Sequence, residues 1–229
     1  MTILRRIPFS LDAEHLRIEA GVQEGSAEAT ELQELVVRAQ QIGCPKALVL
    51  EVLVTKVERE QVQLGEVTFT SRVLAHKLAR VGRVFALLVT CGEEMEHAQI
   101  DTMDLLQRYW WDQLKEQMLN SATHVVHDRV QKRYQLGQTA FLLPGSGERK
   151  IWPIEQQRDL FTLFGEAAAA IGVTLNQACL MTPNKTLSGI LFATDQAYRG
   201  CEVCRRESCS SRCAPFNPTL WQALGLCSE

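Results

Sequence analysis

Four cysteines lie close together near the C-terminus: Cys201, Cys204, Cys209 and Cys213, in the segment CEVCRRESCSSRC. Thiolates this close in sequence can reach one metal centre without help from the rest of the fold. Zinc takes four such ligands in a tetrahedron, and iron–sulfur clusters are also held by four cysteine thiolates. The spacing C-x2-C-x4-C-x3-C matches neither the ferredoxin run nor the paired knuckles of zinc ribbons. The pattern therefore predicts a metal or cluster site and leaves zinc and iron–sulfur open.

Two loops carry residue types that suit a small ligand. The turn PGSG at 144–147 brings backbone amides close together, as a loop that cradles an anion does. In MTPNKTLSG at 181–189, Lys185 suits an anionic ligand, and Gly189 indicates a close backbone approach or a bulge. A turn before a helix and a plain hairpin turn are the simpler alternatives. The candidate binding residues in these loops are Pro144, Gly145, Ser146, Gly147, Pro183, Lys185, Ser188 and Gly189.

A long helical segment offers further polar candidates. Asp112, Asn120 and His124 are eight and four residues apart, which places them close to one face of a helix. Asp112 and Asn120 join the candidate ligand residues, although a partly solvated face also explains the pattern. The run HVVHD lacks the glutamate of an H-E-x-x-H zinc motif, so no histidine metal site is expected.

These candidates must be positioned by a mixed set of helices and strands. Periodicity and breakers predict helices over 27–42, 71–80 and roughly 93–135, and another that opens at Trp152-Pro153 and runs through GEAAAAIGV. Apolar, β-rich runs predict strands at 46–55, 66–70, 84–90, 138–143, 178–182 and 186–192. Because no regular βαβ rhythm appears, we expect an α+β fold: a mostly antiparallel twisted sheet, a long central helix and flanking helices.

Composition narrows the class of protein. The chain has 229 residues, 46% hydrophobic and 22% charged, with a net charge of −3. That charge gives no electrostatic case for a nucleic-acid partner, and no apolar run approaches the roughly 20 residues of a membrane span. No signal peptide is visible, so we expect a cytoplasmic protein. In a reducing compartment the eight cysteines are not expected to form disulfides, and Cys44, Cys91 and Cys179 are expected to be small buried residues.

The segments together resemble one known family. They are LVTCGEEME (88–96), HDRVQKRY (127–134), PGSGERKIWPIEQQRDLF (144–161) and MTPNKTLSGILF (181–192). In this order they resemble the activation (reactivation) domain of vitamin B12-dependent methionine synthase, closest to stand-alone bacterial forms with a C-terminal cysteine motif. The resemblance covers roughly residues 70–215. We accordingly expect an activation-like domain at 1–195 and a small Cys-rich, metal- or cluster-binding tail at 196–229.

The resemblance implies a function. In that family the domain binds S-adenosylmethionine and docks over a cobalamin-carrying domain, where reductive methylation restores methylcobalamin from inactive cob(II)alamin. The chain has no cobalamin-binding D-x-H-x-x-G motif, so cobalamin would arrive on a partner, such as a core methionine synthase or a corrinoid methyltransferase. A separate electron-donor protein is a further expected partner. The protein would supply positioning and electrostatics while the cofactors carry the chemistry.

The chain departs from the family pattern at three ligand positions. The family's arginine before P-G, its tyrosine after P-G and one acidic residue on the long helix correspond to Phe141, Ser146 and Asn120. Asp112 keeps its acidic match. Because a ligand carboxylate prefers an arginine and an ammonium prefers a carboxylate, the changes leave three alternatives open. These are S-adenosylmethionine-dependent reactivation, electron transfer to cob(II)alamin through the cysteine centre, and a non-catalytic corrinoid-protein binding module with a zinc-stapled tail.

Overall fold

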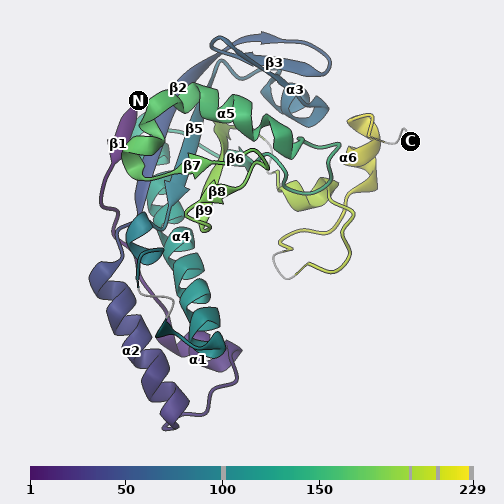
Figure 1. Ribbon diagram of the computed structural model, residues 1–229. Coiled ribbons are helices and arrows are strands. Elements are labelled where there is room, and N and C mark those ends of the chain that lie inside the picture. The colour runs from purple at the N-terminus through teal and green to yellow at the C-terminus, as the bar shows by residue number, and fades with distance from the viewer. Residues whose placement is uncertain (99–101, 196–197, 210–211, 227–229) are drawn as a thin grey trace.

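An antiparallel sheet forms the middle of the molecule (Figure 1). The computed structural model describes residues 1–98, 102–195, 198–209 and 212–226. The strand order is β4-β3-β2-β5-β9-β6, with β1 paired to β2 beside this path, and every pair in it is antiparallel. A separate two-stranded sheet joins β7 to β8. The strands are β1 (Thr2–Leu4), β2 (Lys46–Val57), β3 (Gln61–Leu64), β4 (Val67–Thr70), β5 (Arg83–Thr90), β6 (Thr139–Leu142), β7 (Thr174–Leu175), β8 (Met181–Thr182) and β9 (Thr186–Ala193).

Helices cover both faces of the sheet and extend beyond it (Figure 1). The helices are α1 (Ala13–Glu19), α2 (Ala27–Ile42), α3 (Arg72–Leu78), α4 (Leu105–Tyr134), α5 (Gln157–Phe164) and α6 (Pro218–Ala223). Short 3₁₀ helices occupy Glu93–Met95, Ile154–Gln156, Gly165–Ala167, Ala169–Ile171 and Gly200–Val203. The expected α+β class with a long central helix is confirmed. No helix in the described ranges combines the length and apolar character that a bilayer span requires.

The central strands β5 and β9 are buried on both faces because different helices cover each one. Alternate side chains of a strand point to opposite faces. Phe85 and Leu191 face the C-terminal half of α4 and pack with Val126. Ala86 and Phe192 face the other way, into a cluster that also holds residues of α3, α5 and the C-terminal tail. The tail therefore packs on the same core as the sheet.

The first half of α4 leaves the sheet and forms a helical arm with α1 and α2 (Figure 1). Trp110 and Trp111 of α4 are fully buried there against Leu32 and Val36 of α2. The Trp111 indole N–H donates to the Met95 carbonyl at 3.0 Å, which ties the arm to the segment after β5. The arm thus fixes the position of α4, and with it the polar residues on the exposed side of that helix.

The long helix is shorter than the sequence predicted. Instead of starting near residue 93, α4 begins after Asp104. The Asp104 side chain accepts from the Gln107 amide at 2.8 Å, and the Asp104 amide donates to the Gln107 side-chain oxygen at 3.3 Å. This capping box satisfies amides that a continuous helix would have bonded upstream. The helix expected to run through GEAAAAIGV ends at Phe164, because Gly165 has φ 56° and the chain continues as 3₁₀ turns.

Candidate functional site

A lysine in the turn before β9 is held against α4. The Lys185 ammonium lies 2.9 Å from a carboxylate oxygen of Asp112 and 2.9 Å from one of Glu116. Asp112 and Glu116 are one helical turn apart, so both carboxylates face the same side of α4. Two of the predicted ligand residues, Asp112 and Lys185, are thereby brought into direct contact. Glu116 was not predicted.

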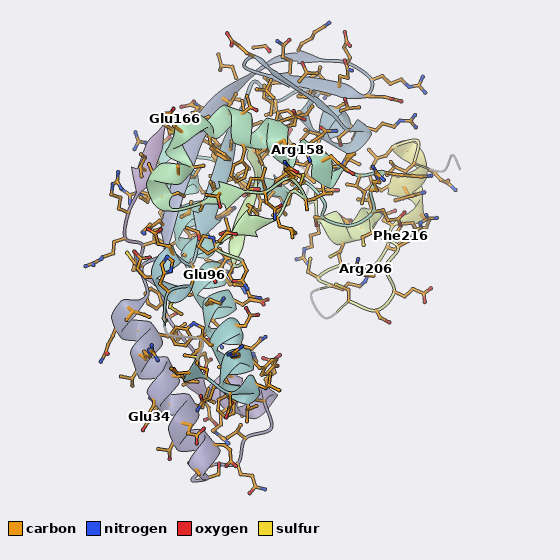
Figure 2. The ribbon with its side chains drawn as sticks, in the orientation of Figure 1. Glu34, Glu96, Arg158, Glu166, Arg206 and Phe216 are labelled. Atoms are coloured by element: carbon orange, nitrogen blue, oxygen red, sulfur yellow. The ribbon has the colours of Figure 1, made fainter. Side chains whose placement is uncertain are left out.

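A second lysine lies beneath this pair. The Lys115 side chain is only 5% exposed, and its ammonium donates to the Asn184 side-chain oxygen at 2.8 Å and to Glu96 at 3.2 Å. Asn184 in turn donates from its side chain to Asp112 at 3.0 Å and from its backbone to Glu96 at 3.1 Å. Figure 2 shows Glu96 beside α4 near the turn before β9. We call Glu96, Asp112, Lys115, Glu116, Asn184 and Lys185 the polar cluster.

The polar cluster has one surplus negative charge, because three carboxylates face two ammoniums. Burial raises the pKa of the Asp112 carboxyl, but the bonds from Lys185 and Asn184 outweigh it and leave that pKa below its usual range. Burial lowers the pKa of Lys185, but the bonds and charges of Asp112 and Glu116 raise it by more. The pKa of Lys185 is therefore above its ordinary value. The charged forms of both partners are therefore favoured at neutral pH.

The backbone of β9 approaches its neighbours closely beside the polar cluster. The Cys91 amide donates to the Lys185 carbonyl at 3.0 Å, and the Thr186 hydroxyl lies 2.9 Å from that of Thr90. A Cβ on Gly189 would lie 2.5 Å from the Leu142 carbonyl oxygen and 2.9 Å from the Phe141 ring. The close backbone approach predicted at Gly189 is confirmed, and Phe141 fills the space that a side chain would need.

The other candidates of this segment and helix lie outside the polar cluster. The Ser188 hydroxyl is buried on the opposite face of the sheet, where it accepts from Gln157 of α5 at 2.6 Å. Pro183 is buried and follows a cis peptide bond. Asn120 is exposed on α4, one turn beyond Glu116. Lys185 and Gly189 thus share the α4 side of β9, whereas Ser188 does not.

The PGSG loop uses some of its amides internally. The Gly145 amide donates to the Trp152 carbonyl at 2.8 Å, and the Ser146 amide to the Leu143 carbonyl at 3.3 Å. Gly145 and Gly147 have φ of 77° and 85°, a backbone region that favours glycine. Pro144 is buried, and the next three residues are exposed. The turn is therefore built by its own hydrogen bonds.

The cysteine tail lies against this loop. The Glu148 carboxylate accepts from the Arg205 backbone amide at 3.2 Å and from its guanidinium at 2.8 and 2.9 Å. A Cβ on Gly147 would come within 3.6 Å of the Cys204 Cβ and 3.9 Å of its sulfur. The Arg205 guanidinium also stacks 4.8 Å from the centre of the Trp221 ring of α6. Loop and tail form one continuous surface.

Two of the four tail cysteines are close together. The sulfurs of Cys201 and Cys213 are 3.5 Å apart, and the Cys213 amide donates to the Cys201 sulfur at 3.4 Å. That backbone bond, with a smaller contribution from Arg212, lowers the pKa of Cys201; the Cys201 sulfur raises the pKa of Cys213. Cys204 is half-buried and Cys209 is exposed. Residues 196–197, 210–211 and 227–229 of the predicted tail lie outside the described residues.

Arg212 organises the segment between the cysteines. Its guanidinium donates to the carbonyls of Cys201 at 3.3 Å, Ala214 at 3.1 Å and Cys204 at 3.0 Å, and also to that of Arg206. A single side chain thus ties together backbone groups that lie on both sides of it in sequence. These bonds contribute to the internal order of the tail.

The cysteine arrangement fits a metal ion only in part. Two thiolates on one zinc ion stand about 3.8 Å apart, given zinc–sulfur bonds of about 2.3 Å, and the Cys201–Cys213 separation of 3.5 Å is close to this. Across the described ranges, however, no three His, Cys, Asp or Glu side chains are grouped as metal ligands. As arranged, one pair of the predicted ligands fits a shared ion and the full set of four does not.

Two of the three cysteines that were expected to be buried outside the tail are buried. Cys91 and Cys179 are buried, and burial raises the pKa of the Cys91 thiol to about 12, so it stays protonated and unreactive. Cys44 is only half-buried and its thiol donates to the Arg5 carbonyl. It is less buried than its apolar neighbours in sequence suggested.

No protein-family model matches the chain, and no curated protein matches it. Among solved structures, the MetH reactivation domain bound to AdoHcy matches with a TM-score of 0.60 and 14% sequence identity. The match covers 87% of this chain and 81% of that one. The chain shares the fold of a reactivation domain. At this identity the likeness concerns the fold alone, and it confirms the resemblance at that level. The stand-alone form and the cysteine motif stay predictions.

Sequence reasoning missed four of the six residues of the polar cluster. Glu96, Lys115, Glu116 and Asn184 were not among the predicted site residues. A usable signal was present: Asp112, Lys115 and Glu116 are three and four residues apart, so they lie on one face of the helix. What the sequence could not supply was their partner, which lies about 70 residues further along the chain.

Proposed function

We propose that this protein reactivates a corrinoid protein, with S-adenosylmethionine as methyl donor. The observation that carries the proposal is the reactivation-domain fold, which extends over most of both chains. In this proposal residues 1–195 form the activation-like domain and 196–229 the Cys-rich tail. Cobalamin is carried by a partner, such as a core methionine synthase or a corrinoid methyltransferase.

The polar cluster supplies charges of both signs for the ligand's amino-acid end. Lys185 suits the ligand carboxylate, the position that Phe141 cannot serve because its ring packs on Gly189. Glu116, whose side chain is 49% exposed, suits the ammonium group. The surplus negative charge of the cluster complements the sulfonium cation. The residues present thus fit the ligand at the level of charge, with Lys185 replacing an arginine.

The reaction balances with one external electron. Cob(II)alamin on the partner takes one electron from a donor protein, and the sulfonium methyl group is then transferred to the reduced cobalt, which leaves S-adenosylhomocysteine. Transfer from a sulfonium is strongly favourable, so it draws the unfavourable reduction forward. The chain's own contribution is to hold S-adenosylmethionine, the methyl donor, near the exposed face of α4 and to orient it.

Calorimetry tests the ligand. S-adenosylmethionine should bind to the purified protein, and S-adenosylhomocysteine more weakly, because it lacks the sulfonium charge. Glu116→Gln should reduce this preference. Glu34→Gln, at an exposed glutamate of α2, removes the same charge away from the polar cluster and should leave the preference unchanged. Failure of both ligands to bind at millimolar concentration, alone and with a cobalamin-carrying partner present, would reject the proposal.

Turnover tests the reaction itself. The cobalamin-binding core of a B12-dependent methionine synthase, in its cob(II)alamin state, is mixed with this protein, S-adenosylmethionine and a low-potential reductant. The absorption spectrum should change to that of methylcobalamin only when all components are present. A spectrum that changes equally without this protein would count against a reactivation role.

The tail favours a second candidate, a corrinoid-protein binding module stapled by zinc. The observation behind it is that Arg212 and the Cys201–Cys213 pair order the tail, and that Val203 and Trp221 anchor it in the main core. An iron–sulfur centre at the same cysteines would instead serve electron transfer to cob(II)alamin. Metal analysis and dithionite bleaching of anaerobically purified protein separate the two. Cys201→Ser with Cys213→Ser should lower metal content, whereas Cys44→Ser should not.

A further inference from the structure

A separate basic hollow lies at the other end of the central strands. It has a volume of about 830 Å³ and is lined by the C-terminal part of α3, the start of β5, the residues after α4 and the end of β9. The hollow adjoins Arg83 at the start of β5, whereas the polar cluster adjoins Thr90 at its end. The hollow and the polar cluster are therefore about 24 Å apart along the strand. The hollow is therefore distinct from the polar cluster.

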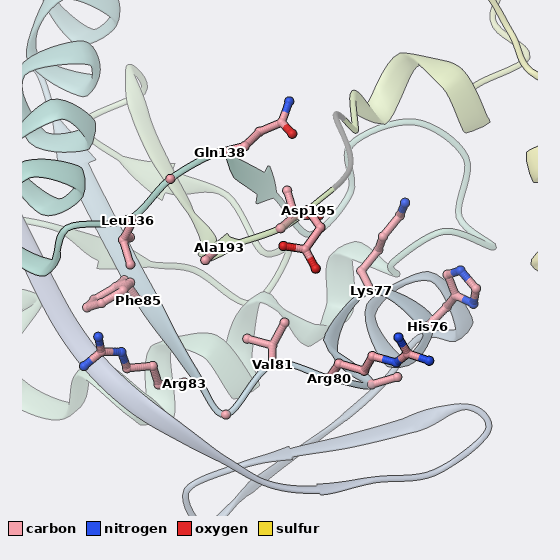
Figure 3. Close-up of a pocket in the computed structure, with 14 residues that line it drawn as sticks. His76, Lys77, Arg80, Val81, Arg83, Phe85, Leu136, Gln138, Ala193 and Asp195 are labelled. Atoms are coloured by element: carbon pink, nitrogen blue, oxygen red, sulfur yellow. The ribbon is translucent and has the colours of Figure 1, made fainter.

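The hollow concentrates positive charge in a chain whose net charge is −3. His76, Lys77, Arg80 and Arg83 line it, and Asp195 is the one carboxylate among its lining residues. Figure 3 shows Lys77, His76 and Arg80 on one side, with Asp195 between them and the opposite wall. Such a gathering of cations around a concavity raises the local concentration of anions.

Some of these cations have no anionic partner in the described part of the chain. The Lys77 ammonium instead rests 4.1 Å from the centre of the Tyr198 ring. Burial lowers the pKa of Lys77, and the charge of Glu202 only partly offsets this. His76 and Arg80 form no hydrogen bond or ion pair with other described residues. Arg83 differs, because it pairs with Glu51 at 3.1 Å.

This arrangement costs stability. Lys77 and Arg80 are three residues apart, so two like charges are neighbours where α3 ends. Basic residues at a helix C-terminus do offset the helix dipole, which accounts for part of the charge. It does not account for burying the Lys77 stem with its ammonium unpaired. A bound anion would relieve both the repulsion and the missing pairing.

The opposite wall is less polar. Phe85, Leu136 and the small residue Ala193 line it, and Figure 3 shows Leu136 and Phe85 across from Lys77, with Arg83 beside Phe85. A volume near 830 Å³ lies within the range of about 300–1,000 Å³ that is usual for cofactor-sized ligands. The hollow thus offers Lys77 and Arg80 on one side, and apolar side chains with the ion-paired Arg83 on the other.

We propose that this hollow binds a phosphate-bearing small molecule of nucleotide size, its phosphates on Lys77 and Arg80. Guanidinium groups suit phosphate oxygens because they donate two parallel bonds, and an ammonium adds a point charge. Glycine at position 82 leaves backbone open beside these side chains, since a Cβ there would meet nothing within 4 Å. The proposal does not depend on the function proposed for the polar cluster.

Calorimetry with ADP, inorganic diphosphate and adenosine tests it on the full-length protein. ADP should bind and adenosine should not. Diphosphate that binds as well as ADP would mean that the phosphates alone are recognised, and weaker diphosphate binding that the nucleoside contributes; both support the proposal. Absence of ADP and diphosphate binding at millimolar concentration, or adenosine binding as tight as ADP, overturns it.

Charge-matched variants locate the binding. Because Arg80 is exposed, the Arg80→Gln variant should fold normally. It should weaken ADP binding about tenfold, since one charge-assisted contact to phosphate is lost. Lys77→Gln with Arg80→Gln should weaken it further. Lys56→Gln with Arg59→Gln removes the same charge from the β2–β3 hairpin and should leave the affinity unchanged. Equal weakening by both double variants overturns the assignment, because binding would then follow net charge alone.

Discussion

The Lys185 ammonium lies 2.9 Å from the Asp112 carboxylate and joins the turn before β9 to the long helix α4. The contact links two segments that are far apart in sequence, as does the hydrogen bond beside it between Asn184 and Asp112, which are 72 positions apart. Because the Lys185 side chain is 20% exposed and that of Asp112 is 37% exposed, the pair is neither dry nor fully solvated. It holds the turn in place while leaving charged surface accessible.

The pair predicts how stability depends on pH. An unfolded aspartate has a pKa of about 3.9, and Asp112 has a lower one when folded, so its contribution is complete above about pH 5 and disappears as pH falls through the folded pKa. Lys185, whose pKa is raised, contributes fully below its unfolded pKa of about 10.4 and loses this as pH rises through the folded value.

Asp112→Asn should therefore reduce the free energy of unfolding at neutral pH by up to about 1 kcal/mol, a small value because the pair is partly solvated. Urea unfolding of the wild type and the variant between pH 2 and pH 8 measures the difference. The difference in unfolding free energy should narrow as the pH falls below about 4 and through the lowered folded pKa of Asp112, because a protonated carboxyl no longer pairs with Lys185. A gap that stays constant down to pH 2 would contradict the assignment.

The buried lysine gives a second prediction. Asn184→Ala removes one acceptor from the Lys115 ammonium, which is 5% exposed, and should cost about 1–3 kcal/mol in unfolding free energy. In the background Lys115→Met, where no buried cation needs an acceptor, the same Asn184→Ala change should cost less. Equal costs in the two backgrounds, measured by urea unfolding, would show that Asn184 acts independently of Lys115.

Packing at β9 gives a third prediction. Gly189→Ala would place a methyl group 2.5 Å from the Leu142 carbonyl oxygen, so β6 must move away from β9. We expect a loss of about 1–3 kcal/mol, the usual cost of overpacking, and a lower melting temperature. Gly200→Ala is the control, because a Cβ there meets nothing within 4 Å. Similar melting temperatures for the two variants would contradict the close approach.

The sequence predicted the elements whose signals are local. Helix α2 begins at Ala27 and ends at Ile42, as its periodicity and breakers indicated, and α3, predicted over 71–80, spans Arg72–Leu78. Short elements without a strong local pattern were missed: β1, β3, β7, α1 and α6. Their positions depend on tertiary pairing, for example β1 on β2, which single-residue propensities do not encode.

The site was predictable only in part for the same reason. Asp112 and Lys185 were chosen for their residue types, but their contact depends on how the turn docks on α4. Ser188 looked equivalent to Lys185 in the sequence, yet strand alternation points it to the opposite face, where it bonds Gln157. The contact between the PGSG loop and the cysteine tail had no signal at all, because Glu148 and Arg205 are 57 positions apart.

That contact gives the last prediction. Arg205 donates three hydrogen bonds to Glu148, two of them from the guanidinium, and this side chain is the main cause of the lowered pKa of Glu148. Arg205→Gln should therefore loosen the contact between loop and tail. Amide hydrogen exchange across 144–150 should become faster in Arg205→Gln. Arg206→Gln, at the next residue, makes the same charge change without a bond to Glu148 and should leave hydrogen exchange in the loop unaltered.

Because the Arg205 backbone amide also bonds Glu148, the loop should loosen without unfolding, and the melting temperature should change little. Equal exchange in both variants would mean that the loop holds its shape through its own bonds, such as that from the Gly145 amide to the Trp152 carbonyl.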